Sequence, residues 1–278
     1  MILSASINLF DGEELLPALL RNWRPRVEHL TVVYQDVSNR GTPAHVDFRA
    51  WMAGLLKLGW IDAAVSYDPL ARPDFSPREH ERAKRHIGLE LARLCGATHF
   101  LSVDVDEFYE ATQFDAGREF VETGGFDGSA CRLLEYHRFP TYQRYELATF
   151  DGEALFVPFI FSVEAGLKSQ EPNFFELFDP TRALPCERPH TFSPDQLVMH
   201  HMTSVRRDRQ SLLRKFSNTS AEWPLETPER LADLVLGFDP KIHAAPCVKE
   251  TDNLFNIHFD SDDALSAERC NYQQRRQA

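Results

Sequence analysis

The sequence lacks the features of membrane-spanning and disulfide-stabilised proteins. No apolar run approaches the ~20 residues that a transmembrane helix needs. The first residues carry no basic cluster, and their apolar stretch stops at Asp11, so we expect a first strand rather than a signal peptide. The five cysteines form no C-x-x-C pair, which disfavours a structural zinc site or a disulfide framework and favours a reducing, cytoplasmic location.

The sequence also contains fewer basic than acidic residues. The chain has 30 Lys and Arg against 42 Asp and Glu, for a formal net charge of −12. General nucleic-acid-binding proteins neutralise phosphates with Lys and Arg, so this balance argues against that class and permits only a local basic groove. An acidic protein that handles a diphosphate usually needs a divalent cation between the two sets of negative charge.

The first half of the chain alternates strand-like and helix-like segments. Asp11 and Glu14 fit a capping box for the first helix, and Ser76 with Glu79 fits one for the third. This β-α order predicts an α/β fold with a doubly wound, mostly parallel sheet, whose ligands bind at the carboxyl ends of the strands. The expected strands span residues 2–9, 29–34, 60–67 and 99–103, the expected helices span 11–23, 48–59 and 76–96, and the third helix is expected to bury an apolar stripe of Ala83, Ile87, Leu91 and Leu94.

Two aspartates, Asp104 and Asp106, directly follow the fourth expected strand. Residues two apart on an extended chain point the same way, so both carboxylates can converge on one cation, or on a cation and a sugar hydroxyl. Mg²⁺ and Mn²⁺ prefer such oxygen ligands and often bridge them to substrate phosphates, where they offset charge on a departing diphosphate. A solvated acidic loop is the alternative interpretation. The following Phe108 and Tyr109 disfavour a calcium loop and an aspartate-nucleophile phosphatase.

These segments resemble glycosyltransferases with the GT-A fold, especially the family-2-like group with its small bacterial and phage members. The resemblance covers roughly residues 1–220 and is most specific over His99–Phe108. It implies one GT-A domain over residues 1–260, with a nucleotide-sugar-binding half (1–110), a mixed α/β acceptor-side half (111–260) and a C-terminal tail (261–278). The other similar segments are Asn8 to Leu16, the loop Asp36–Gly41 (which lacks the second Asp of the family's loop), and His200 to Arg206 with Lys215 and Asn218.

The resemblance also implies roles for individual residues. Asp106 would ligate the metal, while Asp104 would hold the ribose or sugar or assist the metal. One of the adjacent histidines would complete the metal shell, His201 being favoured over His200. Asn8 and Asp36 would lie near the nucleoside, although Asp36 could equally be an ordinary turn former.

Basic residues near these motifs are candidates for contact with the donor diphosphate. One of Arg82, Lys84 and Arg85 would reach it from the third helix, unless that face is only solvated. The cluster from Arg206 to Lys215 would contact the leaving diphosphate or an anionic acceptor, or form a solvated amphipathic helix. An inverting enzyme also needs a base for the acceptor hydroxyl, and we place it at Glu171, from a set that also contains Glu135, Glu164 and Glu176.

The predicted function is a transferase that moves a sugar from a nucleotide-diphosphate sugar, in the first place a UDP-sugar, to an acceptor hydroxyl with the aid of Mn²⁺ or Mg²⁺. The favoured acceptor is a glycan or lipopolysaccharide intermediate. A hydroxymethylated base in DNA is the alternative acceptor, and a non-catalytic nucleotide- or sugar-binding protein is the alternative of another class. A nucleotidyltransferase is disfavoured, because residues 8–12 lack a Gly-rich loop with Arg and Lys.

Overall fold

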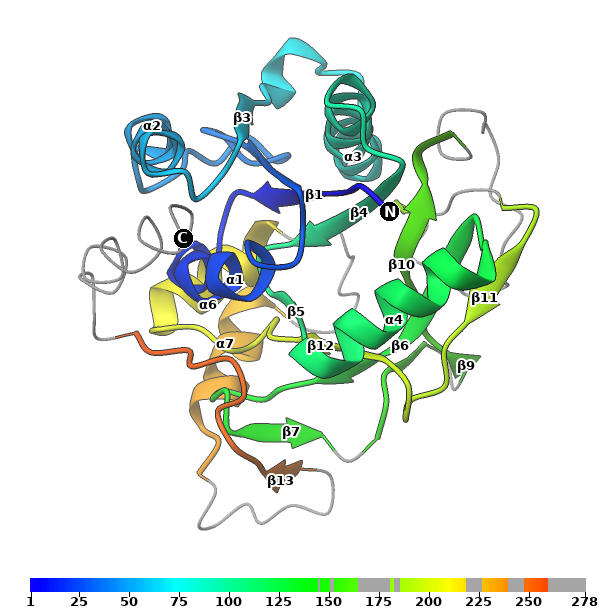
Figure 1. The fold of residues 1–278 in the computed structure, drawn as a ribbon. Helices are drawn as coiled ribbons and strands as arrows, with labels where there is room; N and C mark the ends of the chain where they lie inside the picture. Colours follow the sequence, from blue (N-terminus) through cyan, green and yellow to red (C-terminus); the bar gives the residue numbers. More distant parts are fainter. Residues whose placement is uncertain are drawn as a thin grey trace.

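A computed structural model describes residues 1–144, 146–150, 153–164, 181–182, 186–218, 227–239 and 248–259. Its main element is a nine-stranded mixed sheet with helices on both faces, so the predicted α/β fold with a doubly wound, mostly parallel sheet is confirmed (Figure 1). The strands in chain order are β1 (Leu3–Leu9), β2 (His29–Tyr34), β3 (Ala63–Ser66), β4 (His99–Asp104), β5 (Glu107–Tyr109), β6 (Gly128–Glu135), β10 (Phe156–Ser162), β11 (Pro189–Thr191) and β12 (Val198–His201).

The four N-terminal strands lie in the order β3-β2-β1-β4, and the pairings among these four are all parallel. The sheet continues through β10, β6, β12 and β5, with antiparallel pairings at β4–β10, β10–β6 and β12–β5. The second half therefore has the mixed character that the sequence predicts. Smaller two-stranded sheets join β7 (Tyr142–Arg144) to β13 (Val248–Glu250) and β8 (Thr149–Phe150) to β9 (Glu153–Ala154).

Helices pack on both faces because alternate residues of β1 point to opposite sides. Leu3, Ala5, Ile7 and Leu9 join the main apolar core, whereas Ser6 lies against Gly88 of α3 on the other face. The helices are α1 (Leu16–Trp23), α2 (Phe48–Leu58), α3 (Pro77–Leu94), α4 (Ala111–Gly124), α6 (Arg209–Asn218) and α7 (Pro228–Leu236), with short 3-10 turns η1 (Glu13–Leu15) and η2 (Pro69–Ala71). Among the described residues, none of these helices is long and apolar enough to cross a membrane.

Of the two predicted capping boxes, one is confirmed and one is wrong. Ser76 caps α3 through the predicted capping box with Glu79, because both reciprocal hydrogen bonds form. The capping box predicted for Asp11 and Glu14 is wrong. The chain instead enters η1 through Gly12, whose φ of 75° is left-handed, and Glu14 is buried.

Candidate donor-binding pocket

The site lies at the carboxyl ends of β1 and β4, where the order of the strands reverses. From β1 the chain proceeds to β2 and β3 on one side and then returns to place β4 on the other side. In doubly wound sheets this switch point forms a crevice for ligands. Here Asn8 and Asp104 are paired across the two strands, and both line a pocket that continues to Lys84, Arg85 and Lys215.

Helix α3 supplies basic side chains to this pocket from its buried face. The predicted apolar stripe is wrong, because Leu94 is 69% exposed and the buried residues include Lys84, Arg85 and Gly88. These positions share one helical face. Gly88 permits the close approach, since a Cβ there would lie 2.5 Å from Cβ of Ser6. The buried face of α3 is therefore polar near the pocket, whereas its C-terminal half packs Leu89 and Ala92 against Phe100.

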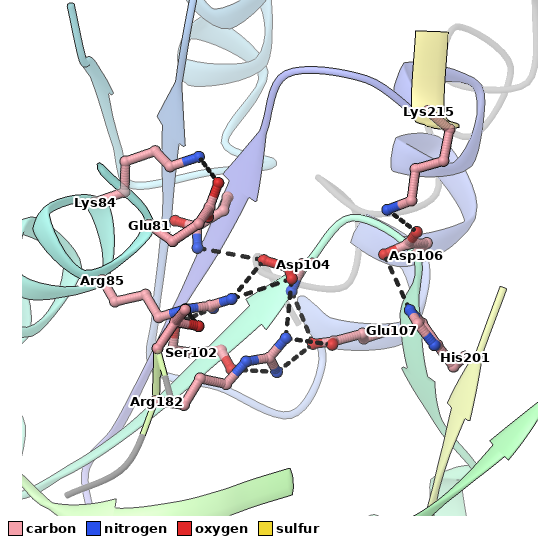
Figure 2. A network of polar contacts seen from close by, with 12 residues as sticks. Glu81, Lys84, Arg85, Ser102, Asp104, Asp106, Glu107, Arg182, His201 and Lys215 are labelled. Carbon is pink, nitrogen blue, oxygen red and sulfur yellow. Dashed lines mark hydrogen bonds and ion pairs between the residues drawn. The ribbon is translucent and has the colours of Figure 1, made fainter. Parts of the chain in front are cut away.

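Asp104 is held by two guanidinium groups and one amide. Nη2 of Arg85 donates to both carboxylate oxygens at 3.1 Å, and Nη2 of Arg182 donates to Oδ2 at 2.9 Å (Figure 2). Nδ2 of Asn8 donates to Oδ1 at 3.3 Å. Arg182 also forms a bidentate ion pair with Glu107, whose Oε2 accepts a hydrogen bond from the Asp104 amide at 2.9 Å. Asp104 and Glu107 are therefore joined through one arginine.

Asp106 faces a different set of groups. Strand β4 ends at Asp104, and Asp106 lies in the turn before β5, so the two-residue strand period does not extend to it. Its Oδ2 accepts from Nη2 of Arg206 at 2.8 Å and lies 2.9 Å from Nζ of Lys215, while Oδ1 lies 3.8 Å from Nε2 of His201. Figure 2 shows the two aspartates turned toward separate partners. Strand alternation therefore does not bring the two carboxylates together as expected, because Asp106 lies in a turn.

Arg206 is fixed more firmly than any other cation at Asp106. Its side chain is fully buried, and Nη1 donates to the backbone oxygens of Met202 at 2.7 Å and Val205 at 3.0 Å. Gly12 lies directly against it, since a Cβ on Gly12 would be 3.3 Å from Nη2 of Arg206 and 2.8 Å from Cγ1 of Val105. The tight turn after β1 therefore holds the guanidinium in place.

The pKa shifts of both aspartates follow from these contacts. Burial opposes ionisation of Asp104, but Arg85 and Arg182 outweigh it and hold the pKa of this carboxyl well below its usual range. Burial likewise opposes ionisation of Asp106, and Lys215 and Arg206 again lower its pKa well below the ordinary value. Both groups are therefore carboxylates at neutral pH, able to accept hydrogen bonds or to ligate a cation.

The far wall of the pocket is a closed ring of polar side chains. Lys84 donates to Oε1 of Gln35 at 2.6 Å and to Oε1 of Glu81 at 2.8 Å. Asn39 completes the ring, accepting from Nε2 of Gln35 at 2.8 Å and donating to Glu81 at 2.7 Å. The carboxylates of Glu81, Asp104, Asp106 and Glu107 are each paired with Lys or Arg, which offsets their negative charge.

Three buried oxygen atoms on the pocket wall have no hydrogen-bond partner among the described residues. They are Oδ1 of Asn8, Oδ1 of Asp106 and Oδ1 of Asn218. The amide of Asn8 is oriented by Asp104, because a carboxylate can only accept, so its oxygen must point elsewhere. Unpaired buried acceptors are costly, and ligand hydroxyls or a cation would satisfy them.

Asp106 and His201 carry the described atoms that would be ligands for a divalent cation. The free Oδ1 of Asp106 and Nε2 of His201 are an oxygen and a nitrogen of the kinds that Mn²⁺ and Mg²⁺ accept. Within the described ranges, no cluster of three or more His, Cys, Asp or Glu residues could hold a metal. The described protein groups would therefore supply two ligands, and substrate phosphates and water the remainder, as is common for Mg²⁺.

The two adjacent histidines point in different directions. Nδ1 of His200 lies 2.9 Å from the hydroxyl of Tyr136, and its ring packs against Phe255, away from Asp106. Burial lowers the pKa of His200 to about 4, so its imidazole is neutral at neutral pH. Of the two predicted ligands, the structure brings His201 to Asp106 and leaves His200 in the core.

Several predicted residues lie outside the pocket or outside the described part of the chain. Asp36 and Arg82 are exposed, and neither is among the pocket-lining residues. Glu171, the predicted base, falls outside the described residues, as does the predicted tail 261–278. Among the other base candidates, Glu135 is paired with His201 between β6 and β12, and its Oε2 lies 3.4 Å from Nη1 of Arg144.

The basic cluster from Arg206 to Lys215 is largely paired within the protein. Arg206 and Lys215 contact Asp106, Arg214 contacts Glu13 at 3.1 Å, and Arg209 contacts Asp233 at 2.9 Å. This pairing leaves little of the cluster's charge for a DNA backbone, so it does not favour the modified-base acceptor.

Sequence reasoning gave too little weight to Gln35, Arg85 and Arg182. Gln35 adjoins the predicted Asp36, but both follow the end of β2, so no strand pattern in the sequence decides which of them faces the pocket. Arg85 is signalled by its spacing from Glu81 and Gly88 on one helical face. Arg182 has no local signal, because it reaches Asp104 and Glu107 from 75 or more residues along the chain.

Comparisons with known proteins give only a distant likeness. No family model matches the sequence, and no curated protein matches it. The structure is similar to S. aureus TarS 1-349 in complex with UDP, at 14% identity and a TM-score of 0.44, covering 87% of this chain and 73% of that one. It is also similar to mannose-1-phosphate geranyltransferase from Thermus thermophilus, at 12% identity and a TM-score of 0.38, covering 81% of each chain. Against a longer TarS structure, at 14% identity and a TM-score of 0.43, the match covers 85% of this chain but only 42% of that one.

Proposed function

We propose that this protein is a glycosyltransferase that moves a sugar from a nucleoside-diphosphate donor to a hydroxyl of a glycan or lipopolysaccharide intermediate. The observation that supports it most is the carboxylate of Asp106, which lies at the switch point of the sheet and leaves Oδ1 without a partner among the described residues beside His201. This arrangement offers a cation two protein ligands in a pocket already lined with Lys and Arg.

Each part of the donor has a suitable region of the pocket. Lys84, Arg85 and Lys215 are the cations that line it, and a diphosphate binds between such groups. The free oxygens of Asn8 and Asn218 can accept from ribose or sugar hydroxyls. A bound divalent cation would offset the charge that develops on the departing diphosphate. The protein's own contribution is to orient the donor and to hold these charges in fixed positions before reaction.

Ligand binding tests the proposal directly. Thermal unfolding would be measured with UDP, GDP, CDP and dTDP and their sugars, with and without Mn²⁺, for the wild type and Asp106→Asn. A ligand at ~100 times its dissociation constant stabilises the native state by about 2.7 kcal/mol, which is visible as a rise in melting temperature. We expect one nucleotide to stabilise the wild type in the presence of metal and to lose most of this effect in Asp106→Asn.

The matched control is Asp195→Asn, which removes an exposed carboxylate that does not line the pocket. It should respond to nucleotide and metal as the wild type does. Slow release of free sugar from the stabilising donor, measured by chromatography, separates an enzyme from a binding protein. The absence of stabilisation by every nucleotide tested would refute the proposal.

A further inference from the structure

Two cations share the same carboxylate oxygen of Asp106, and they are held very differently. Arg206 is fully buried and donates to two backbone oxygens as well as to Asp106. Lys215 has a side chain that is 20% exposed, lines the pocket, and reaches Oδ2 of Asp106 at 2.9 Å from helix α6. Arg206 is thus part of the framework, whereas Lys215 is placed at the boundary between the framework and the ligand space.

Lys215 is one of two full positive charges beside Asp106. Arg206 already supplies a full positive charge at 2.8 Å, in a position that backbone contacts and Gly12 keep fixed. Nζ of Lys215 ends a flexible four-carbon stem, so it can reorient without moving the helix. A divalent cation at Oδ1 of Asp106 would also repel this ammonium group, because both would then share one carboxylate.

We propose that Lys215 is an exchangeable partner of Asp106, and that it leaves the contact seen in the structure for the donor diphosphate when a divalent cation binds beside His201. This inference rests on the proposed function and adds a residue to it. The same side chain then has two opposed effects. It competes with the metal when no nucleotide is present, and it binds phosphate oxygens once the nucleotide is there.

Because the two effects are opposed, Lys215→Met should change the affinities for Mn²⁺ and for the nucleotide in opposite directions. Met keeps most of the apolar stem and removes the ammonium, while Arg206 continues to neutralise Asp106. We expect the affinity for Mn²⁺ alone to rise about tenfold, because a competing cation is lost. We expect the affinity for the nucleoside diphosphate at saturating Mn²⁺ to fall about tenfold or more, as loss of one charge-assisted hydrogen bond predicts.

Both affinities can be measured without turnover. Free Mn²⁺ would be followed by electron paramagnetic resonance during a titration of the protein, and nucleotide binding by calorimetry with the diphosphate that stabilises the wild type. Lys57→Met is the matched control, since Lys57 is exposed near the end of α2 and does not line the pocket. Thermal unfolding and circular dichroism would confirm that both variants are folded.

The outcomes separate this inference from the proposed function. Tighter Mn²⁺ binding together with weaker nucleotide binding in Lys215→Met, and neither change in Lys57→Met, supports the exchange. Unchanged or weaker Mn²⁺ binding overturns it, even where the wild type binds nucleotide and the proposed function stands. Weaker binding of both ligands also overturns it, because Lys215 would then only support the shape of the site.

Discussion

Replacement of Gly12 by Ala should perturb the protein through the position of Arg206. Gly12 has a φ of 75°, and a Cβ there would lie 2.8 Å from Cγ1 of Val105 and 3.3 Å from Nη2 of Arg206. The substitution therefore carries two penalties. A non-glycine residue in the left-handed region costs roughly 1–2 kcal/mol, and forcing an extra methyl into a packed site costs roughly 1–3 kcal/mol more.

Gly59 allows the two penalties to be separated. It has a similar φ of 73° at the end of α2, but a Cβ there would meet nothing within 4 Å. Gly59→Ala should therefore cost only the conformational penalty of roughly 1–2 kcal/mol. The lower entropy of the unfolded chain affects both variants alike, so it cancels in the comparison. The difference between the two variants measures the contact of Gly12 with Val105 and Arg206.

Urea unfolding followed by circular dichroism gives both free energies, provided that the slope of the transition is unchanged. We expect Gly12→Ala to be less stable than Gly59→Ala by roughly 1–3 kcal/mol. It should also bind Mn²⁺ or nucleotide more weakly, because Arg206 positions Asp106. Equal stabilities and equal affinities in the two variants would show that the turn after β1 does not press on Arg206, which would refute the packing argument.

Two further predictions concern buried groups beside the pocket. Burial and the neighbouring Glu14 raise the pKa of Glu13 from 4.5 to about 7. The contribution of Glu13 to the free energy of unfolding is therefore fully present below pH 4.5 and is lost as the pH rises through 7. Glu13→Gln should therefore gain roughly 3 kcal/mol relative to the wild type between pH 4.5 and pH 8, as measured by urea unfolding, and a difference that does not vary with pH would contradict this. Tyr136→Phe should cost about 1–3 kcal/mol, because Nδ1 of His200 loses its hydroxyl partner. It should leave Mn²⁺ affinity unchanged, and a large loss of metal affinity would implicate His200 in the site.

The order of elements in the first half could be predicted because each strand and helix carries its own local pattern. The expected strand at 99–103 is β4, Ser76 starts α3 as expected, and the α/β order predicts helices on both faces of the sheet. The prediction of the buried face of α3 failed because the sequence pattern allows two different faces. The stripe from Ala83 to Leu94 is as periodic as the buried face with Lys84 and Arg85, and only the polar surface of β1 and β4 decides between them.

The position of the candidate site could be predicted from the sequence, but its internal pairing could not. Asp104 and Asp106 mark the end of a buried strand, which suffices to place the pocket at the carboxyl ends of the strands. The cations that pair with them come from α3, from Arg182, from Arg206 ahead of α6 and from α6, at sequence separations of 19 to 109 residues. Such separations are fixed by tertiary packing, and neither periodicity nor charge counting can reveal them.

The buried ion pairs beneath the pocket are better explained by binding than by stability. Removing Asp106 and Arg206 from water has a large desolvation penalty, and apolar residues of similar size often stabilise a fold as well or better. Both side chains are almost fully buried, so this penalty applies in full. What the pair provides is a carboxylate whose position and ionisation are fixed before a ligand arrives. A preformed carboxylate of this kind would suit the proposed site, which would have to hold a cation and a diphosphate in one orientation at the switch point of the sheet.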